Sequence, residues 1–275
     1  MELRGTAMVT GAGRGIGRAV AIELASRGVD VVATVRRDGD GADLPELGAG
    51  RISVALLDVT DPSSWVVPED LTILVNNAGA DADHVPLEFH DPAAWRTMFE
   101  TNVFGLAGLT AAAIPTLRAN APGVVCAITS SSILTAVPFY AGYRASKAAA
   151  SAICDSLRVE LAPFGVRVVE ILPGPVATDM FEASLAPPEA ARYPAYREMA
   201  ERGAELKRQA ADPMVEPADR PAISIVDALL DDAGPMRSSC DPLGTGMLEL
   251  WRTSDDEAMF QLVSGGYGLE PPGPA

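Results

Sequence analysis

Lysine is scarce in this chain of 275 residues, because only two of its 21 cationic side chains are lysines. Basic residues of both kinds are also outnumbered, since 37 acidic side chains give a formal net charge of −16. Such a charge argues against nucleic acid and against an anionic membrane surface as a partner. One of the two lysines, Lys147, nevertheless stands four residues after Tyr143, in a tract that otherwise uses arginine. An ammonium kept at this position suggests a specific role beside the tyrosine.

Cysteines and long apolar runs are also few. Cys126, Cys154 and Cys240 lack the number and spacing of a disulfide framework or a zinc site, so we expect reduced, buried thiols and no metal. The longest apolar tract, Val103 to Leu117, is interrupted by glycines and a proline and is too short to span a bilayer. The N-terminus lacks the basic and apolar regions of a signal peptide. We therefore expect a cytoplasmic protein.

Short apolar runs alternate with helical patterns along most of the chain. Strands are predicted at residues 6–10, 29–35, 51–57, 71–75, 123–129 and 166–172. Helices are predicted from the first glycines to about residue 27, over 92–118, over the segment with Tyr143 to about 164, and over 217–230. This alternation is typical of a parallel sheet covered on both faces. We predict an α/β fold, a doubly wound parallel sheet in a single domain over 1–275, with ligands at the carboxyl ends of its strands.

Residues 177–216 interrupt this alternation with prolines, tyrosines and short helical stretches. They follow the carboxyl end of a strand, so we expect a helical lid over the ligand site, with a pair of surface helices as the alternative. Their larger apolar side chains are Phe181, Leu185, Tyr193, Tyr196 and Met199. These side chains suggest a bulky, apolar substrate. Residues 265–275, rich in glycine and proline, are predicted to form a disordered tail.

Tyr143 and Lys147 lie in an Ala- and Leu-rich segment that is predicted to be helical. Residues i and i+4 are neighbours on one helix face, so the phenol and the ammonium should lie side by side. A positive charge there favours the phenolate and should lower the tyrosine pKa from about 10. The pair could then give and take a proton near neutral pH. The alternative is a helix face with one aromatic ring and one solvated cation.

Gly11, Gly15 and Gly17 lie between a predicted strand and a predicted helix, with the spacing GxxxGxG. Glycine permits a tight turn and lets the backbone approach a pyrophosphate closely. The N-terminus of the following helix attracts the negative charge of that pyrophosphate. This context favours a dinucleotide site over an ordinary glycine-rich turn.

Six motifs follow one another in a familiar order. They are TGAGRGIG, NNAG, the asparagine of Thr101-Asn102-Val103, the serines at 130–132, YxxxK and PGPVATDM. Over roughly residues 3–180 the chain resembles the short-chain dehydrogenases/reductases. The resemblance implies a Rossmann-type fold and hydride transfer between a nicotinamide dinucleotide and a carbonyl or hydroxyl carbon.

The resemblance implies a catalytic tetrad at Asn102, Ser130, Tyr143 and Lys147. In such enzymes the tyrosine exchanges a proton with the substrate oxygen and the serine hydrogen-bonds that oxygen. The lysine lowers the tyrosine pKa and holds the nicotinamide ribose, and the asparagine supports a water relay. Three consecutive serines leave alternatives open, and we prefer Ser130, which lies thirteen residues before Tyr143, over the two that follow it.

The predicted second strand ends at Val35, followed by Arg36 and Arg37, with no carboxylate before Asp38. Family members that use NAD usually carry an acidic residue there, whereas a guanidinium suits a ribose phosphate. Arg14 in the glycine loop adds a further cation, so NADP(H) is the expected cofactor. The implied cofactor-binding residues are Gly11, Arg14, Gly15, Ile16, Gly17, Arg36, Asp58, Val59, Asn77, Tyr143, Lys147, Val176 and Thr178.

Two departures from the family pattern are visible. Only twelve residues separate Asp58 from Leu71, so the helix usual there is cut to a turn around 62–68. The C-terminal region lacks the glycine-rich last strand and closing motif of the family's tetramers, and resembles the tails of hydroxysteroid-dehydrogenase-like reductases. We expect a homodimer through the helices at 92–118 and 142–163, with a tetramer as the alternative.

The predicted function is that of an NADPH-dependent ketoreductase, or of the reverse alcohol dehydrogenase, with a small-molecule substrate. One alternative is an epimerase or dehydratase on the same scaffold, although such relatives usually carry a larger C-terminal domain. The other is a catalytically silent NADP(H)-sensing protein. Such proteins typically lose the tyrosine or the lysine, and both are present here.

Overall fold

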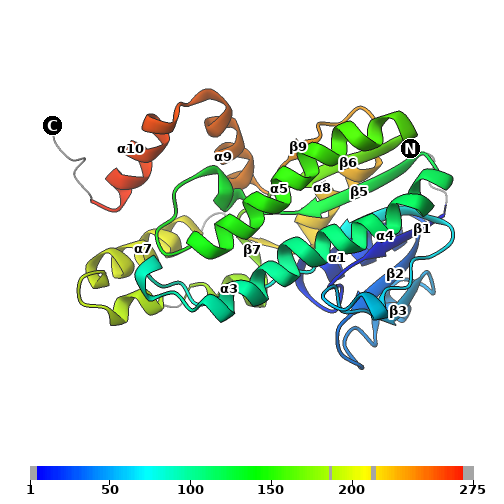
Figure 1. The fold of residues 1–275 in the computed structure, drawn as a ribbon, viewed down its shortest axis with the longest axis horizontal. Helices are drawn as coiled ribbons and strands as arrows, with labels where there is room; N and C mark the ends of the chain where they lie inside the picture. Colours follow the sequence, from blue (N-terminus) through cyan, green and yellow to red (C-terminus); the bar gives the residue numbers. More distant parts are fainter. Residues whose placement is uncertain (1–4, 186–187, 212–214, 269–275) are drawn as a thin grey trace.

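A parallel sheet forms the centre of the protein, seen in a computed structural model that describes residues 5–185, 188–211 and 215–268 (Figure 1). Within these ranges seven strands lie in the order β3-β2-β1-β4-β5-β6-β9. They are β1 Thr6–Val9, β2 Asp30–Val35, β3 Ile52–Leu56, β4 Leu71–Asn76, β5 Gly123–Ile128, β6 Val166–Ile171 and β9 Arg237–Ser238. Every pair in this sheet is parallel, and the order reverses between β1 and β4. The predicted doubly wound sheet is confirmed.

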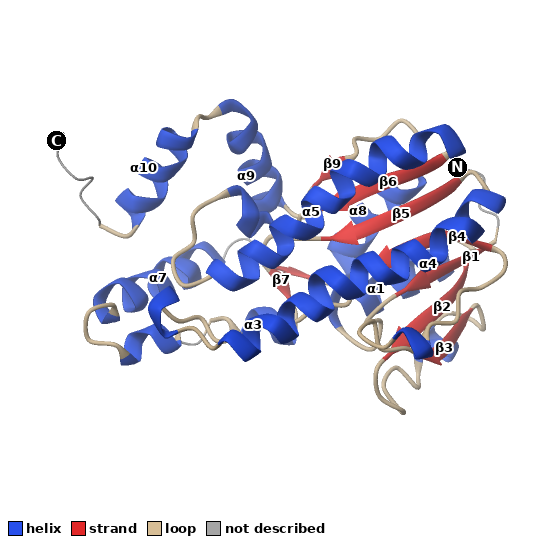
Figure 2. Ribbon diagram, in the orientation of Figure 1, coloured by secondary structure: helices blue, strands red, loops and turns tan. Residues whose placement is uncertain are grey.

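Helices cover both faces of the sheet, as Figure 2 shows. Outside residues 177–216, the α-helices of the described residues are α1 Gly15–Ser26, α2 Leu44–Leu47, α3 Pro92–Phe99, α4 Leu106–Ala119, α5 Ala141–Leu161, α8 Asp219–Leu230, α9 Pro242–Thr253 and α10 Asp256–Gly266. On one face α1 and α8 bury Leu24 and Ile225 against the strands. On the other face α4 and α5 bury Leu109 and Cys154. Two apolar layers therefore sandwich the sheet, and its carboxyl edge stays open for a ligand.

The predicted helix over 92–118 is divided in the structure. A π-helical turn, Glu100–Gly105, separates α3 from α4. A Cβ on Gly105 would lie 2.8 Å from the carbonyl oxygen of Val59, so the helix approaches the chain after β3 very closely here. Asn102 lies in this π-helical turn. Its side chain is buried and forms a hydrogen bond with Ala80, outside the helix. Turns of this kind are frequent at functional sites.

The shortened connection between β3 and β4 is confirmed. It contains one turn of 3-10 helix, Pro62–Ser64, in place of a full helix. The indole of Trp65 covers α4 instead, since a Cβ on Gly108 would lie 2.5 Å from that ring. The indole Nε1 donates to the Asp58 carbonyl oxygen over 3.0 Å. One large side chain thus fills the place left by the missing helix.

The C-terminal region contributes more structure than the sequence predicted. β9 adds a seventh strand beside β6, and α9 and α10 follow it. Of the predicted tail, residues 265–268 form the end of α10 and the turn after it, and residues 269–275 lie outside the described residues. Cys126, Cys154 and Cys240 are buried free thiols, as expected.

The described residues also bear on metals and membranes. They contain no cluster of His, Cys, Asp and Glu that could hold a metal ion. None of the helices in this part of the chain is both long and apolar enough to cross a membrane.

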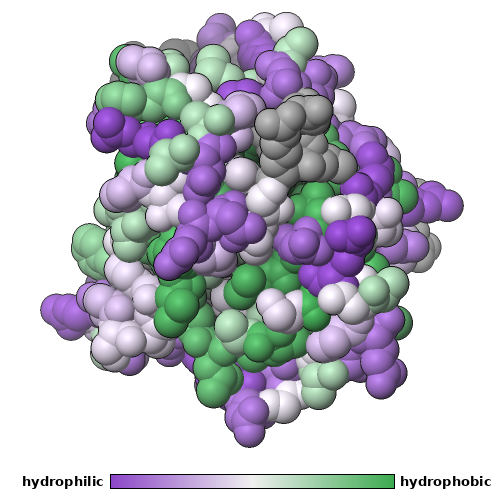
Figure 3. Space-filling view, turned by 90° about the vertical axis from the view of Figure 1, so that its right-hand side faces the viewer, coloured by the Kyte–Doolittle hydropathy of each residue, from purple (hydrophilic) through white to green (hydrophobic). Residues whose placement is uncertain are grey.

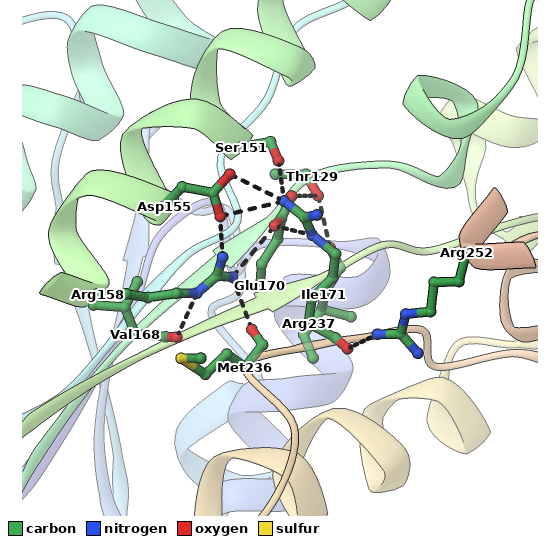
Figure 4. Close-up of polar contacts among 10 residues, drawn as sticks. All are labelled: Thr129, Ser151, Asp155, Arg158, Val168, Glu170, Ile171, Met236, Arg237 and Arg252. Atoms are coloured by element: carbon green, nitrogen blue, oxygen red, sulfur yellow. Dashed lines mark hydrogen bonds and ion pairs between the residues drawn. The ribbon is translucent and has the colours of Figure 1, made fainter. Parts of the chain in front are cut away.

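A charged cluster fastens β9 to the core (Figure 4). Glu170 on β6 is fully buried, and its carboxylate accepts from Arg237 Nε over 2.8 Å and from Thr129 Oγ1 over 3.0 Å. Arg158 of α5 reaches the same carboxylate over 3.4 Å, and Arg237 also donates to Ser151 Oγ over 2.9 Å. A buried charge is tolerated when it is paired and hydrogen-bonded in this way. The cluster ties β5, β6, β9 and α5 together.

The opposite edge of the sheet is exposed. Figure 3 looks at the molecule from the side away from the carboxyl ends of the strands, and apolar surface gathers on the lower part of that face. β3 is the last strand at this edge of the sheet, and its Val54 and Leu56 are exposed. An exposed apolar edge strand can pair with a strand of another molecule. β3 has only five residues, and this short length limits such pairing.

The segment 177–216 forms a flap whose two ends lie side by side. Its helices are α6 Asp179–Ala183 and α7 Arg197–Ala211, and its ends are joined where β7 Val176–Ala177 pairs with β8 Glu216–Pro217. Tyr193 stacks on Phe89 with ring centroids 4.0 Å apart, and the Tyr196 hydroxyl donates to Glu88 over 2.5 Å. The flap is therefore held at its base and against the loop before α3.

Candidate active site

A cavity of about 830 Å³ opens beside the carboxyl ends of the central strands. The predicted site residues that line it are Gly11, Arg14, Gly15, Ile16, Arg36, Asp58, Val59, Asn77, Ser130, Tyr143, Lys147, Val176 and Thr178. The other two, Gly17 and Asn102, lie one layer behind its wall. The structure thus brings together residues from along two thirds of the chain.

The glycine loop follows β1 and enters α1. Gly11 and Gly15 have φ values of 64° and 58°, in the left-handed region that favours glycine. A Cβ on Gly17 would lie 2.3 Å from Asn77 Nδ2, so this position has no room for a side chain. Arg14, at the N-cap of α1, provides no side-chain cap. The first N–H groups of α1 are therefore available to a phosphate.

The arginines cluster beside this loop. β2 ends at Val35, and Arg36 and Arg37 follow it into the cavity wall. The backbone N–H of Thr60, and secondarily the charge of Arg36, hold the pKa of Asp58 below its usual value. The ribose end of a dinucleotide would meet these two guanidinium groups.

Arg14 has a partner that the sequence did not reveal. Its guanidinium is 2.8 Å from the carboxylate of Asp179, the first residue of α6. Both side chains are more than two-thirds exposed, so the pair contributes little to stability. It does connect the glycine loop with the flap. A Cβ on Gly15 would also lie 3.2 Å from Thr178 Cγ2, so the two segments touch at this point.

Tyr143 and Lys147 lie side by side on α5, as predicted. Lys147 Nζ is 5.9 Å from the centroid of the Tyr143 ring and donates to the Ile128 carbonyl oxygen over 2.9 Å. A Cβ on Gly79 would lie 3.4 Å from that Nζ. The ammonium is therefore enclosed by the end of β5 and by the NNAG loop.

The predicted direction of the tyrosine pKa is wrong for this structure. Burial raises the pKa of Tyr143 to about 12, Asp81 adds to the effect, and a hydrogen bond with Ser130 opposes it. Burial also lowers the pKa of Lys147 to about 8. Desolvation is the largest cause of both shifts, and the ammonium donates to a carbonyl oxygen and not to the phenol.

The three serines have different surroundings. Ser130 hydrogen-bonds Tyr143, and its Oγ is 2.9 Å from Ser132 Oγ. The backbone N–H of Ser131 donates to the Pro173 carbonyl oxygen over 2.9 Å. Ser130 is the serine beside the phenol, in agreement with the choice made from its spacing. Its catalytic role stays a prediction.

Asn102 joins the NNAG loop to α5 from inside the π-helical turn. Its Oδ1 accepts from the Ala80 N–H over 2.7 Å, and its Nδ2 donates to the Ala80 carbonyl oxygen over 2.8 Å. The same Nδ2 donates to Ser146 Oγ over 2.9 Å, and Ser146 in turn donates to the Tyr143 carbonyl oxygen. The amide thus ties the NNAG loop, which borders Lys147, to the helix that carries this lysine. A water relay through Asn102 stays a prediction.

Sequence reasoning missed one end of the cavity. Asp81, His84, Tyr140, Lys207 and Tyr267 line it there. His84 stacks on Tyr140 with ring centroids 3.7 Å apart and lies 3.1 Å from an oxygen of Asp81. Lys207 Nζ donates to the Tyr140 hydroxyl over 2.6 Å. The scarcity of lysine was the one signal that could have found Lys207, because it is the second of the two.

Of the five lid side chains expected to face the ligand, Phe181 lines the cavity, and Leu185, Tyr193, Tyr196 and Met199 are not among its lining residues. Tyr193 and Tyr196 fasten the flap to neighbouring loops, as described above. The wall itself includes Phe181 and Leu206 from the flap and Met247 from α9. The C-terminal region therefore takes part in the cavity.

A doubly wound sheet, a glycine loop after its first strand and a Tyr–Lys pair in a cavity at its carboxyl edge are the features of an α/β oxidoreductase. Residues 5–188 match the family described as short chain dehydrogenase. The chain belongs to this family and is an oxidoreductase of the class that acts on CH–OH and C=O groups.

Known relatives agree with this assignment. The uncharacterized oxidoreductase YusZ of Bacillus subtilis (strain 168) is 37% identical over 197 residues, which are 65% of this chain and 68% of that protein. Retinol dehydrogenase 8 of Homo sapiens is 33% identical over 202 residues, 69% of this chain and 64% of that protein. A crystal structure of a short chain dehydrogenase from Burkholderia cenocepacia J2315 in complex with NADP has a TM-score of 0.72 and 28% identity, covering 98% of this chain and all of that one.

Proposed function

We propose that this protein is an NADP(H)-dependent ketoreductase, or alcohol dehydrogenase, in which Tyr143 is the general acid and base. The observation that carries the proposal is the contact of Ser130 with Tyr143 beside the buried Lys147, in the cavity that also contains the glycine loop. A bound nicotinamide would supply or accept the hydride. The protein would supply the proton, the position and the exclusion of water.

The residues fit the steps that they would perform. With a pKa of about 12 the phenol of Tyr143 is protonated at neutral pH, so it can donate a proton to the oxygen of a carbonyl substrate. Ser130 Oγ would hydrogen-bond the same oxygen as negative charge develops on it. Lys147, which borders the NNAG loop, would bind the ribose hydroxyls.

Arg36 and Arg37 support NADP(H) as the cofactor. They follow β2 directly and line the cavity, where they would bind the phosphate on the ribose. The NADP complex of the Burkholderia cenocepacia protein supports the same choice. The pyrophosphate would lie on the N-terminus of α1.

We propose further that the chain acts as one domain over 1–275, with residues 177–216 as a lid over a bulky, apolar substrate. The apolar wall of Phe181, Leu206 and Met247 supports such a substrate. The relative named retinol dehydrogenase supports it as well. We also propose a homodimer through α4 and α5, because Phe104, Val159 and Phe164 are exposed on or beside these helices.

The test is a panel of bulky ketones and aldehydes, assayed by the loss of NADPH absorbance and in parallel with NADH. We expect turnover with NADPH for at least one bulky ketone, and none with Tyr143→Phe. An enzyme that reduces no carbonyl and oxidises none of the corresponding alcohols with either cofactor would contradict the proposal.

A further inference from the structure

The second lysine of the chain lies in the same cavity as the first. Lys207 is on α7, and its ammonium points to the start of α5, where Tyr140 precedes the proposed proton donor Tyr143 by three residues. That spacing is about one helical turn, roughly 5 Å along the axis. A group bound at Lys207 would therefore be near a carbonyl bound at Tyr143.

Neutral oxygens surround this ammonium. Lys207 Nζ donates to the Tyr140 hydroxyl over 2.6 Å, to Ser184 Oγ over 2.6 Å and to the Ser184 carbonyl oxygen over 3.1 Å. It takes part in none of the ion pairs found among the described residues. The charge is thus partly buried with no carboxylate bound to it.

The nearest acidic group in this end of the cavity is already engaged. The carboxylate of Asp81 is 3.1 Å from His84 Nε2 and accepts the Ala82 N–H over 2.8 Å. Asp81 favours the charged form of Lys207, but burial has the larger effect and lowers the pKa of Lys207 to about 8. Neutral oxygens occupy the three N–H donors of this ammonium, so a bound anion would replace one of them and supply the counter-charge that they lack.

We propose that Lys207 binds a carboxylate, or a similar oxyanion, of the substrate, so that the preferred substrates are acidic carbonyl compounds or the corresponding hydroxy acids. The proposal rests on the proposed function and specifies its substrate class. The acidic group would lie within a few bonds of the reacting carbonyl, because of the short spacing between Tyr140 and Tyr143. The rest of the molecule would pack on the apolar wall formed by Phe181, Leu206 and Met247.

The first test compares matched substrates. Benzoylformate and 3-benzoylpropionate are assayed against their methyl esters with NADPH, in wild type, Lys207→Met and Lys207→Arg. We expect wild type to prefer at least one acid over its ester. Lys207→Met should lower the acid-to-ester ratio of kcat/KM about ten- to hundred-fold, the effect of losing one charge-assisted hydrogen bond. Lys207→Arg, which keeps the charge, should retain part of the ratio.

A purely structural role for Lys207 makes a different prediction. If this side chain only fastens α7 and Ser184 to α5, Lys207→Met lowers the melting temperature and leaves the acid-to-ester ratio unchanged. That result would overturn the proposal. A wild-type enzyme that handles acids and esters equally would overturn it too.

A second measurement does not depend on turnover. With only two lysines in the chain, labelling with ¹³Cε-lysine gives two NMR signals, which Lys207→Arg assigns. Adding the acids to the NADPH-loaded protein should move the Lys207 signal and raise its pKa, whereas the esters should not. If no acid moves the signal, the inference fails even for an active reductase. If an acid moves it and no carbonyl is turned over, the proposed function fails and the anion site stands.

Discussion

Tyr143 and Lys147 differ from free side chains because both are largely enclosed in the wall of one cavity, Lys147 more completely than Tyr143. In the proposed mechanism the phenol of Tyr143 transfers the proton to the substrate oxygen. Tyr143→Phe should therefore lower kcat by at least about a hundred-fold, the size of a general acid–base contribution, and leave NADPH affinity nearly intact. Steady-state kinetics and NADPH fluorescence titration measure the two effects.

Tyr140→Phe is the matched control for this prediction, since it removes a hydroxyl one turn away on the same helix. It should cost far less kcat than Tyr143→Phe. If Tyr143→Phe retains more than a small fraction of the turnover, the phenol is not the proton donor.

In the proposed function, the preference for NADP(H) depends on Arg36. Losing a charge-assisted contact with the ribose phosphate should weaken NADPH by about 1.5–3 kcal/mol in Arg36→Ala, and NADH much less. Val35→Asp should move the preference toward NADH, because a carboxylate there repels the phosphate and binds ribose hydroxyls. Isothermal titration with both cofactors measures this. Arg51→Ala, which removes an exposed arginine paired with Asp30, is the control, and equal wild-type affinities for the two cofactors would disprove the assignment.

Burial gives the two lysines an unusual pH dependence. The pKa values of Lys147 and Lys207 are lowered from 10.5 to about 8, so both ammonium groups should lose a proton near pH 8 in the folded protein. Below pH 8 each is charged in the folded and in the unfolded state, and its burial costs stability. The cost is relieved as the pH rises from 8 toward 10.5, because only the folded state releases these protons there. Titration of the two ¹³Cε signals checks the midpoints, and two midpoints near 10.5 would contradict the prediction.

At the scale of elements, the flap over residues 177–216 is fixed at its base by β7 and β8 and at its side by Tyr193 and Tyr196. We expect its remaining contacts with the cavity to form fully only around ligands. Amide hydrogen exchange should slow in peptides from 177–185 and 188–211 when NADPH binds, and slow further with substrate or product. Exchange in β5, which is buried throughout, serves as the internal reference. Equal protection in the free and bound protein would mean a fixed wall instead of a lid.

The sequence predicted those elements whose pattern is local. The six longer strands are apolar runs, and the structure has each within one or two residues of the predicted bounds. β9 was not predicted, because a strand of two residues shows no hydrophobic periodicity. Its position depends on Arg237 reaching the buried Glu170, a contact between residues 67 positions apart. The π-helical turn was not predicted for a similar reason, because it is associated with hydrogen bonds between Asn102 and Ala80, which are distant in the sequence.

The same distinction applies to the site. The glycine loop and the Tyr–Lys pair are short motifs, and sequence spacing placed them correctly. The end of the cavity formed by His84, Lys207 and Tyr267 comes from three distant segments, whose meeting depends on how the flap and α10 pack. The pKa of Tyr143 could not be predicted either, since its direction is decided by the depth of burial.

At the scale of the whole molecule, the proposed dimer has a direct test. Val159 on α5 is 77% exposed, and Phe104 before α4 and Phe164 after α5 are exposed as well. Light scattering should give a dimer for wild type and a monomer for Val159→Glu, because a charge in an apolar interface lacks a partner. Ile223→Glu is the control, since Ile223 is exposed on α8, over the opposite face of the sheet. A monomeric wild type, or a Val159→Glu protein that stays dimeric, would contradict this interface.

The placement of both lysines inside the cavity has a consequence for the chemical durability of the protein. Aldehydes and reactive ketones form imines with primary amines, and the arginines that make up the rest of the cations do not react in this way. Apart from the N-terminal amine, the chain presents such reagents with only the two amines that line the cavity. A bound nucleotide and substrate would cover both. The outer surface of the protein therefore offers carbonyl compounds almost no amine with which they could form an imine.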